Sequence, residues 1–173
     1  MTDQSIREAS PRDVPALAAL ITEAWQTAYT GIVDPEYPRT LHPSRFENIF
    51  SKMISEKIET FFVYEDETGI LGFVSGKILT EGVYDCEVVG LYVHPDCRGR
   101  GIGGLLLERM KQFFVANTRG HMIIWTLLGA RNNSFYRKSG GTGKEYKELW
   151  IGGKPYPGVG FAFLLPGLRD VAC

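Results

Sequence analysis

The segment from Glu87 to Gly104 constrains the fold of this chain more than any other. Apolar residues run almost without interruption from Val88 to Val93, Pro95 ends the run, and a loop rich in arginine and glycine follows. This pattern predicts a central strand covered on both faces, a tight loop, and a helix over about Gly101–Ala116. Backbone amides at such a helix start lie at the positive end of the helix dipole, so the junction predicts a site for an anion such as a diphosphate.

The remaining periodic segments alternate between strand-like and helix-like patterns, which is typical of layered domains that contain both. The strands that we expect are Ser5–Glu8, Thr60–Tyr64, Ile70–Leu79, Tyr84–His94, His121–Leu127, Glu145–Ile151 and Tyr156–Leu164. No linker or internal repeat interrupts the 173 residues, a length that suits one domain. We therefore expect a single α+β domain over residues 1–173, with a central, mixed, mostly antiparallel sheet flanked by helices.

Capping residues and glycines predict where the helices begin and end. Ser10 and Pro11 start the first helix, which ends near Tyr29, and Ser44 is expected to cap a second helix that follows three prolines. Asn132 or Asn133 caps a short helix that ends at the glycines 140–141. In the helix after the glycine loop, the residues expected to face the core are Ile102, Leu105, Leu106, Met110, Phe113 and Phe114. The glycines 152–153 predict a hairpin turn.

Composition excludes several classes of protein. The net charge of −1 argues against a nucleic-acid binder that works by bulk electrostatics. Three cysteines, Cys86, Cys97 and Cys173, form no disulfide framework and suit a reducing compartment. The first residues lack the pattern of a signal peptide, and no run approaches the ~20 apolar residues that cross a bilayer. We expect a cytoplasmic protein with no membrane or nucleic-acid partner, and a homodimer is a common arrangement for such proteins.

One interpretation of the glycine loop is a dinucleotide site. Gly99, Gly101 and Gly104 match the spacing G-x-G-x-x-G. A nicotinamide-dinucleotide site also needs an acidic residue about 20 positions further on, at the end of the next strand. The next expected strand, His121–Leu127, contains no acidic residue, which disfavours this interpretation.

The same loop resembles a second kind of protein. The run Arg98–Gly103 fits the R-x-x-G-x-G signature of the GNAT-type N-acetyltransferase superfamily, and Leu91–Pro95 resembles the strand that enters that loop. Phe135–Gly141 resembles the family's second motif, a helix with an aromatic pair followed by glycine. The order of the expected elements matches over nearly the whole chain. The resemblance implies an acyl-CoA N-acyltransferase fold.

The resemblance also implies acetyl-CoA as the donor. Its pyrophosphate would lie on the amides of the glycine loop, and its pantetheine arm would pair with the central strand, where that strand diverges from His121–Leu127. Family members commonly have asparagine directly after the glycine that corresponds to Gly129, whereas this chain has Ala130 there and Asn132 shortly after. The residues expected to bind the cofactor are Leu91, Tyr92, Val93, Arg98, Gly99, Arg100, Gly101, Ile102, Gly103, Gly104, Asn132 and Lys138.

Acetyl transfer to an amine needs two proton transfers. A lysine-like amine has a pKa of ~10.4, so a base must remove a proton at neutral pH, and the departing thiolate gains from a proton donor. Glu87 is the expected base, either directly or through water, because it is a carboxylate in an otherwise apolar strand and matches a glutamate that related enzymes often carry. By the same resemblance, Tyr136 is the expected acid.

The resemblance places the acceptor near the end of the first helix and the last hairpin. It nominates the aromatic residues Trp25, Tyr29, Tyr84, Trp150 and Tyr156, a set that suits a small-molecule primary amine. The alternative function is a non-catalytic acyl-CoA sensor or partner-binding module on the same fold.

No metal site is expected. His94, Asp96 and Cys97 are close in sequence, but no second cluster completes a zinc site. Cys97 would act as a nucleophile only with a histidine base positioned beside it.

Overall fold

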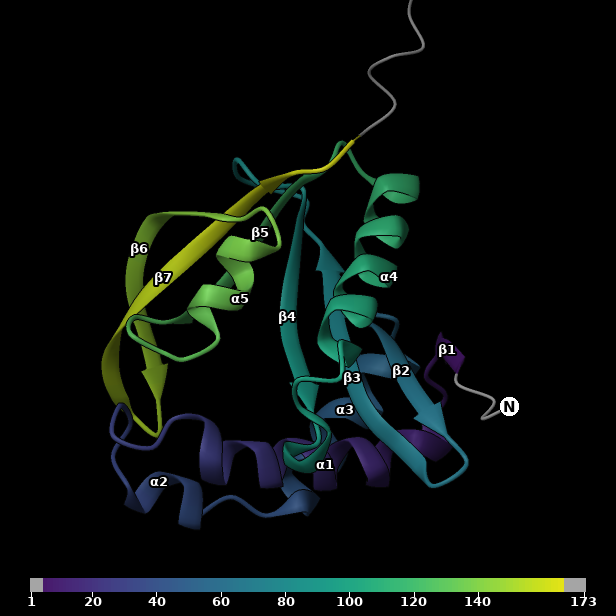
Figure 1. Cartoon of the computed structure of the whole chain (residues 1–173), viewed down its shortest axis with the longest axis vertical. Coiled ribbons are helices and arrows are strands. Elements are labelled where there is room, and N and C mark those ends of the chain that lie inside the picture. Colours follow the sequence, from purple (N-terminus) through teal and green to yellow (C-terminus); the bar gives the residue numbers. More distant parts are fainter. Residues whose placement is uncertain (1–4, 167–173) are drawn as a thin grey trace, which may run out of the picture.

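The computed structural model describes residues 5–166, in which one sheet carries helices on both faces (Figure 1). Cys173 lies outside these residues. The elements in chain order are β1 (Ser5–Glu8), η1 (Pro11–Asp13), α1 (Val14–Ala28), α2 (Glu36–Arg39), α3 (Pro43–Ser55), β2 (Thr60–Asp66), β3 (Gly69–Ile78), β4 (Cys86–Val93), η2 (Pro95–Cys97), α4 (Ile102–Asn117), β5 (His121–Leu127), α5 (Asn133–Lys138), β6 (Thr142–Ile151) and β7 (Lys154–Leu164). Among the described residues, no helix is both long enough and apolar enough to cross a bilayer.

Seven strands form an open mixed sheet in the order β1-β2-β3-β4-β5-β7-β6. All neighbouring strands are antiparallel except β4 and β5, which are parallel. Their pairing covers only Cys86–Val88 opposite Met122–Ile124, at the beginning of both strands. Beyond Val88 the two strands diverge (Figure 1). The expected α+β architecture, with a mixed and mostly antiparallel sheet, is confirmed.

Apolar side chains fill both faces of the sheet. One cluster lies between the sheet and the helices α4 and α5 and contains Met110 and Phe161. The other lies under α1 and α3 and contains Leu17. The neighbouring residues Phe61 and Phe62 of β2 belong to different clusters, as alternation along a strand requires. The two layers of helices hold β4 in the middle of the molecule.

The second helical region differs from its predicted form. Helix α3 begins at Pro43 with His42 at the N-cap, so Ser44 is a residue of the first turn and does not cap the helix. Proline suits the first helical position because the amide that it lacks would have no partner there. The segment before it, which contains Pro35 and Pro38, also forms the short helix α2.

The inner face of α4 was predicted correctly except at one residue. Leu105 is 52% exposed, and Leu107 is fully buried instead. The prediction for β4 was wrong in its second half, because Val89 is 41% exposed and Leu91–Val93 are only partly covered. The divergence from β5 leaves this half of β4 paired with β3 alone, so its apolar residues line an opening on the side of β5.

Two glycine pairs confirm the predicted chain reversals. Gly152 and Gly153 both have positive φ angles, 58° and 79°, which suits the two-residue turn between β6 and β7. At the end of α5 the amide of Gly140 donates to the carbonyl of Arg137, and the amide of Gly141 donates to that of Tyr136. This pair of bonds is a Schellman motif, and it ends α5 one turn after Tyr136.

Candidate active site

The glycine loop between β4 and α4 forms a cradle of backbone amides. Gly99 and Gly101 have φ angles of 77° and 81°, in the left-handed region that glycine adopts without strain. The first hydrogen bond of α4 runs from the amide of Leu105 to the carbonyl of Gly101. The amides of the helix's first turn therefore have no intrahelical partner and lie at its positive end. This arrangement favours an anionic ligand, as the sequence predicts.

A cavity of about 570 Å³ opens over this cradle. Its lining comes from the end of α1, the second half of β4, the glycine loop and α5. Of the residues expected to bind the cofactor, it contains Leu91, Tyr92, Val93, Arg98, Gly99, Gly101, Ile102, Gly103, Gly104 and Asn132. We call this the donor cavity. Ala24 and Thr27 of α1 also line it, and neither residue was predicted from the sequence.

Two residues expected at the cofactor lie elsewhere. The Arg100 guanidinium donates to the Cys97 sulfur at 3.4 Å and does not line the donor cavity. Lys138 is exposed at the end of α5, also outside this lining. Arg98 and Arg131 are the cations that line the donor cavity.

A smaller cavity of about 150 Å³ adjoins the donor cavity where β4 and β5 diverge. Both cavities are lined by Tyr29, Leu91, Tyr92, Asn132 and Tyr136. The small cavity is otherwise lined by Trp25, Val88, Val89, Gly90, Ile124, Trp125, Thr126, Leu127, Leu149 and Ile151. We call it the acceptor cavity. The central strand thus borders two openings, one over the glycine cradle and one lined by uncharged residues.

Tyr136 lies at the junction of the two cavities and is buried. Burial raises the pKa of its phenol, the nearby Tyr29 adds to this effect, and hydrogen bonding with Asn132 opposes it. Burial likewise raises the pKa of Tyr29, again opposed by Asn132. The phenol of Tyr136 therefore remains protonated throughout the neutral pH range.

The structure brings together only part of the predicted acceptor site. Trp25 and Tyr29 line the acceptor cavity, and their ring centroids are 4.4 Å apart. Tyr84 lies outside it and donates a hydrogen bond to Glu145 at 2.9 Å. Tyr156 also lies outside, where its hydroxyl accepts a hydrogen bond from the amide of Asp34.

Trp150 does not contribute to the acceptor cavity, which is a further correction. It is 68% exposed, whereas its neighbours Leu149 and Ile151 line the cavity. Successive residues of a strand point to opposite faces, so the prediction selected the wrong face of β6. The aromatic residue that the sequence analysis missed is Trp125 of β5, and β5 was already expected to border the gap.

Glu87, the expected base, lies beside the gap without lining either cavity. Its side chain is 20% exposed, and a carboxylate oxygen lies 3.4 Å from the amine nitrogen of Lys77 on β3. Glu59 and Ser75 are close to this pair. Burial raises the pKa of Glu59 and Glu87 adds to that effect, whereas Ser75 and Lys77 oppose it.

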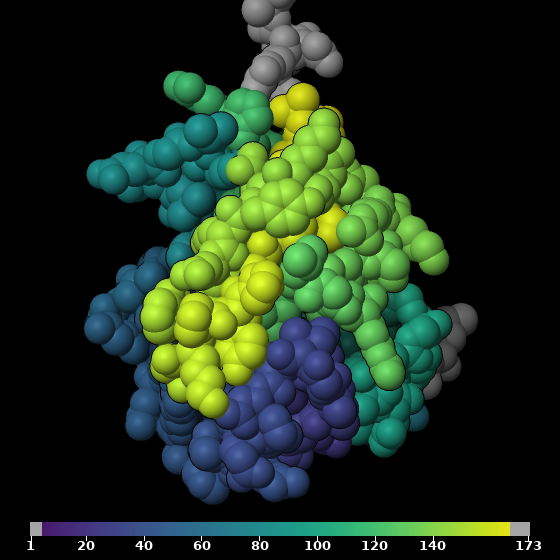
Figure 2. All heavy atoms as spheres, turned by 90° about the vertical axis from the view of Figure 1, so that its left-hand side faces the viewer, coloured from purple at the N-terminus to yellow at the C-terminus, as the bar shows by residue number. Residues whose placement is uncertain are grey.

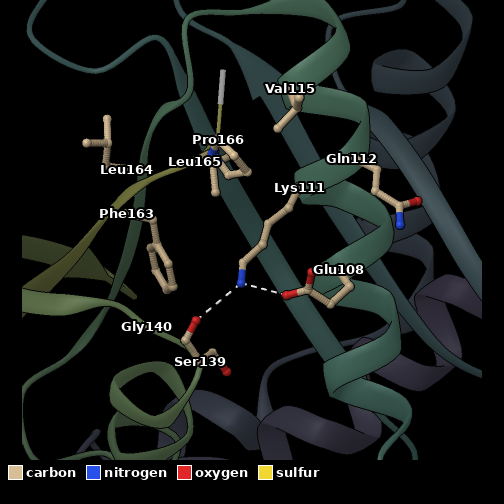
Figure 3. A pocket seen from close by; sticks show the side chains of 10 residues that line it. All are labelled: Glu108, Lys111, Gln112, Val115, Ser139, Gly140, Phe163, Leu164, Leu165 and Pro166. Atoms are coloured by element: carbon tan, nitrogen blue, oxygen red, sulfur yellow. Dashed lines mark hydrogen bonds and ion pairs between the residues drawn. The ribbon is translucent and has the colours of Figure 1, made fainter. Parts of the chain in front are cut away.

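A third cavity, of about 440 Å³, lies between α4, the end of α5 and the end of β7 (Figure 3). It shares no lining residue with the other two cavities. Its cation, Lys111, donates to Glu108 at 2.7 Å and to the carbonyl of Ser139 at 3.2 Å (Figure 3). In the described part of the chain, no three histidine, cysteine or acidic side chains gather as a metal site. The two cavities at the gap are therefore the candidate active site.

Comparison with known proteins agrees with this geometry. Residues 57–140 match the model of the acetyltransferase (GNAT) domain. An uncharacterized N-acetyltransferase of Bacillus subtilis, YuaI, is 29% identical over 136 residues, which cover 77% of each chain. Among solved structures, a GCN5-related N-acetyltransferase from Rhodopseudomonas palustris has a TM-score of 0.77 at 20% identity, covering 95% of this chain and 98% of that one. The PaiA N-acetyltransferase of Thermoplasma acidophilum, solved with coenzyme A, has a TM-score of 0.70 at 20% identity, covering 93% and 99%.

A sheet that opens between β4 and β5, with a glycine cradle at the opening, defines an acetyltransferase fold. Residues 57–140 match the acetyltransferase (GNAT) domain, and the chain shares the fold of solved GNAT N-acetyltransferases. The resemblance inferred from the two sequence motifs is confirmed.

Proposed function

We propose that this protein transfers the acetyl group of acetyl-CoA to a primary amine of a small molecule, by direct attack while both substrates are bound. The observation that carries the proposal is the junction of the donor and acceptor cavities at Tyr136. We further propose that residues 1–173 act as one domain. The PaiA relative, which was solved with coenzyme A, supports the choice of donor.

The donor cavity offers a partner for each part of acetyl-CoA. The amides of the glycine loop and the guanidinium of Arg98 suit the pyrophosphate. The uncovered backbone of Leu91–Val93 suits the amides of the pantetheine arm, because β5 no longer pairs with this half of β4. The backbone amides there also provide donors that polarise the thioester carbonyl. Asn132, at the junction, is the proposed contact near the reacting end.

Tyr136 is the proposed general acid. Its raised pKa keeps the phenol protonated at neutral pH, so it holds a proton to give to the sulfur as the thiolate leaves. The attacking nitrogen forms the new bond to the carbonyl carbon, and the bond from that carbon to sulfur breaks. The nitrogen loses its extra proton to a base.

Glu87 is the proposed base. Because its side chain lies outside the lining of both cavities, we propose that a water molecule relays the proton. The ion pair with Lys77 holds the carboxylate of Glu87 in position on β4.

The acceptor cavity indicates the chemistry of the amine. No residue of its lining carries a charge, and aromatic and aliphatic side chains make up most of it. A second cationic centre would find no carboxylate there, and burying an unpaired charge is costly. We therefore propose a monoamine whose remaining part is small and apolar or aromatic.

Two measurements on the purified protein test the proposal. Calorimetric titration with acetyl-CoA and with NAD first establishes the donor, and only acetyl-CoA should bind. Thiol release is then followed with aromatic and aliphatic monoamines and with diamines of matched length. Turnover with the monoamines supports the proposed function. Binding of acetyl-CoA without turnover of any amine would favour a sensor, and failure to bind would overturn the donor assignment.

A further inference from the structure

Helix α5 carries Tyr136 but is too short to fix its own position. It has six residues, Asn133–Lys138, and helices of this length are not stable in water without tertiary contacts. Three of its residues, Ser134, Arg137 and Lys138, are exposed, and the outer side of the helix lies at the molecular surface (Figure 2). The place of the Tyr136 side chain therefore depends on the contacts that attach α5 to the rest of the fold.

One contact with α4 is made by the residue before Tyr136. A Cβ atom at Gly103, in the first turn of α4, would lie 3.7 Å from the ring of Phe135. Phe135 and Gly103 both line the donor cavity. This contact joins α5 to the end of α4 that is proposed to bind the pyrophosphate.

A second contact with α4 comes from Lys111, about two turns further along that helix than Gly103. Its amine donates to the carbonyl of Ser139, directly after α5, at 3.2 Å, and to Glu108 at 2.7 Å (Figure 3). It also lies 5.2 Å from the centre of the Phe163 ring. The last carbonyls of a helix lack intrahelical partners, and a lysine that binds one of them is favoured there. Lys111 thus holds the end of α5 against α4.

A lysine is unfavourable at this position if packing is its only role. The side chain of Lys111 is 14% exposed, and a buried ammonium loses hydration that an apolar side chain of similar length does not need. Glu108 is 62% exposed, so water screens the ion pair and makes it weak. The bond to Ser139 is therefore the contact that distinguishes Lys111 from an apolar residue.

We propose that Lys111 is a positioning residue, which holds α5 so that Tyr136 stays at the junction of the two cavities. The inference rests on the proposed function, in which Tyr136 is the general acid. Along the chain, the contacts of Phe135 and Ser139 attach α5 to α4 on both sides of Tyr136. The helix that begins at the glycine cradle therefore also sets the position of the acid. Misplacing a reacting group by about 1 Å lowers a rate by up to ~100-fold.

Lys111→Met removes the amine and keeps most of the length of the side chain. We expect kcat for acetyl transfer to fall about tenfold, whereas the Kd of acetyl-CoA should change little because the glycine cradle is intact. Water in the third cavity reaches the Ser139 carbonyl in place of the amine, so the variant should fold, and circular dichroism melts check this. Lys111→Arg keeps a donor and should retain most of the activity. Glu108→Gln removes the ion pair and leaves the bond to Ser139, so it should retain the wild-type kcat.

A double-mutant cycle with Tyr136→Phe shows whether Lys111 acts through the acid. If it does, the variant with both substitutions should be no slower than Tyr136→Phe alone, because no acid remains to be misplaced. Losses that multiply would show that Lys111 acts independently of Tyr136 and would overturn the proposal, as would an unchanged kcat in Lys111→Met. An active wild type with an equally active Tyr136→Phe variant would overturn both the assigned acid and this proposal.

Hydrogen exchange tests the attachment of α5 without any turnover. The amides of Gly140 and Gly141 donate to carbonyls of α5, and they should exchange several-fold faster in Lys111→Met than in the wild type or in Lys111→Arg. Amides in the middle of α4 should keep their rates. Faster exchange at α5 in a protein that acetylates no amine would support the attachment and overturn the proposed function alone. Unchanged exchange at α5 would overturn the role of Lys111 whatever the activity.

Discussion

The hydroxyl of Thr126 donates to the side-chain oxygen of Asn132 at 3.1 Å, across the gap between the end of β5 and the beginning of α5. Thr126 is buried and lines the acceptor cavity, whereas Asn132 lines both cavities. The bond leaves the amide of Asn132 free to face Tyr29 and Tyr136. One hydrogen bond thus orients the polar group that meets both phenols.

Replacing Thr126 with valine removes this donor without changing the volume of the side chain. Loss of one partner of a buried hydrogen bond costs about 1–3 kcal/mol, so the melting temperature should fall by a few degrees. The kcat for acetyl transfer should fall as well, because Asn132 is no longer held. Thermal melts and thiol-release rates measure the two effects. Thr126→Ser, which keeps the hydroxyl, is the control; equal behaviour of the valine and serine variants would contradict the assigned role.

Tyr136→Phe removes the proposed acid and keeps the ring. We expect kcat to fall roughly 100-fold, a usual size for the loss of a general acid. The dissociation constant of acetyl-CoA should change little, because the backbone of the loop and strand provides most of its partners. Tyr29→Phe is the matched control, since that phenol also meets Asn132. A larger loss in the Tyr29 variant would assign the acid to Tyr29.

The parts of the site that depend on backbone were predictable from sequence. A short segment of chain specifies the glycine loop, because its glycines 99 and 101, the strand before it and the helix after it are all local features of the sequence. The divergence of β4 from β5 was expected from the family resemblance. Arg100 and Lys138 were misplaced because a long charged side chain can turn toward several partners, and Arg100 turned to Cys97.

The acceptor side was harder to predict because it depends on which face of a strand a residue occupies. On β6 a shift of one position separates Trp150, which is exposed, from Leu149, which lines the cavity. A register shift in the pairing of β6 with β7, between Gly143 and Glu145, further obscures the alternation in the sequence. The ring of Trp125 lies against Gly160 of β7. This contact joins two strands that are far apart in the sequence, so no local sequence pattern predicts it.

Gly104→Ala separates the stability of the protein from its affinity for the donor. A Cβ atom at this helical position would meet no protein atom within 4 Å, and alanine favours a helix over glycine by about 0.5–1 kcal/mol. The melting temperature without ligand should therefore rise. The added methyl group projects where Gly104 lines the donor cavity, so the dissociation constant of acetyl-CoA should increase about tenfold, or ~1.4 kcal/mol. An unchanged dissociation constant in calorimetry would remove Gly104 from the site.

Glu87→Gln tests the proposed base through its pH dependence. At neutral pH the variant should be slow, because no group takes the proton from the amine. As the pH approaches the amine's own pKa of ~10.4, water removes that proton and the rate should approach that of the wild type. Glu59→Gln, in the same polar cluster, is the matched control and should retain the wild-type profile. The reverse pattern in the two rate profiles would make Glu59 the base.

The guanidinium of Arg7, on β1, forms ion pairs with two carboxylates, Asp13 of η1 and Glu65 of β2. It lies 2.8 Å from Asp13 and 2.8 Å from Glu65. The hydrogen bond from Arg7 is the largest cause that lowers the pKa of Asp13, to about 2, and bonds from Ser10 add to it. An unfolded aspartate has a pKa of ~3.9, so the ionised form stabilises the folded state above that pH. This contribution disappears as the pH falls from about 4 to about 2.

Asp13→Asn should therefore lower the free energy of unfolding by about 2 kcal/mol at pH 7, since a shift of one pKa unit corresponds to ~1.4 kcal/mol. The difference between wild type and variant should shrink steadily below pH 4, as the wild-type carboxylate takes up a proton. Urea unfolding at a series of pH values measures it, and Glu8→Gln at an exposed position without such a partner is the control. A difference that stays constant down to pH 2 would mean that the loss is one of packing, because a change in packing does not depend on the charge of Asp13.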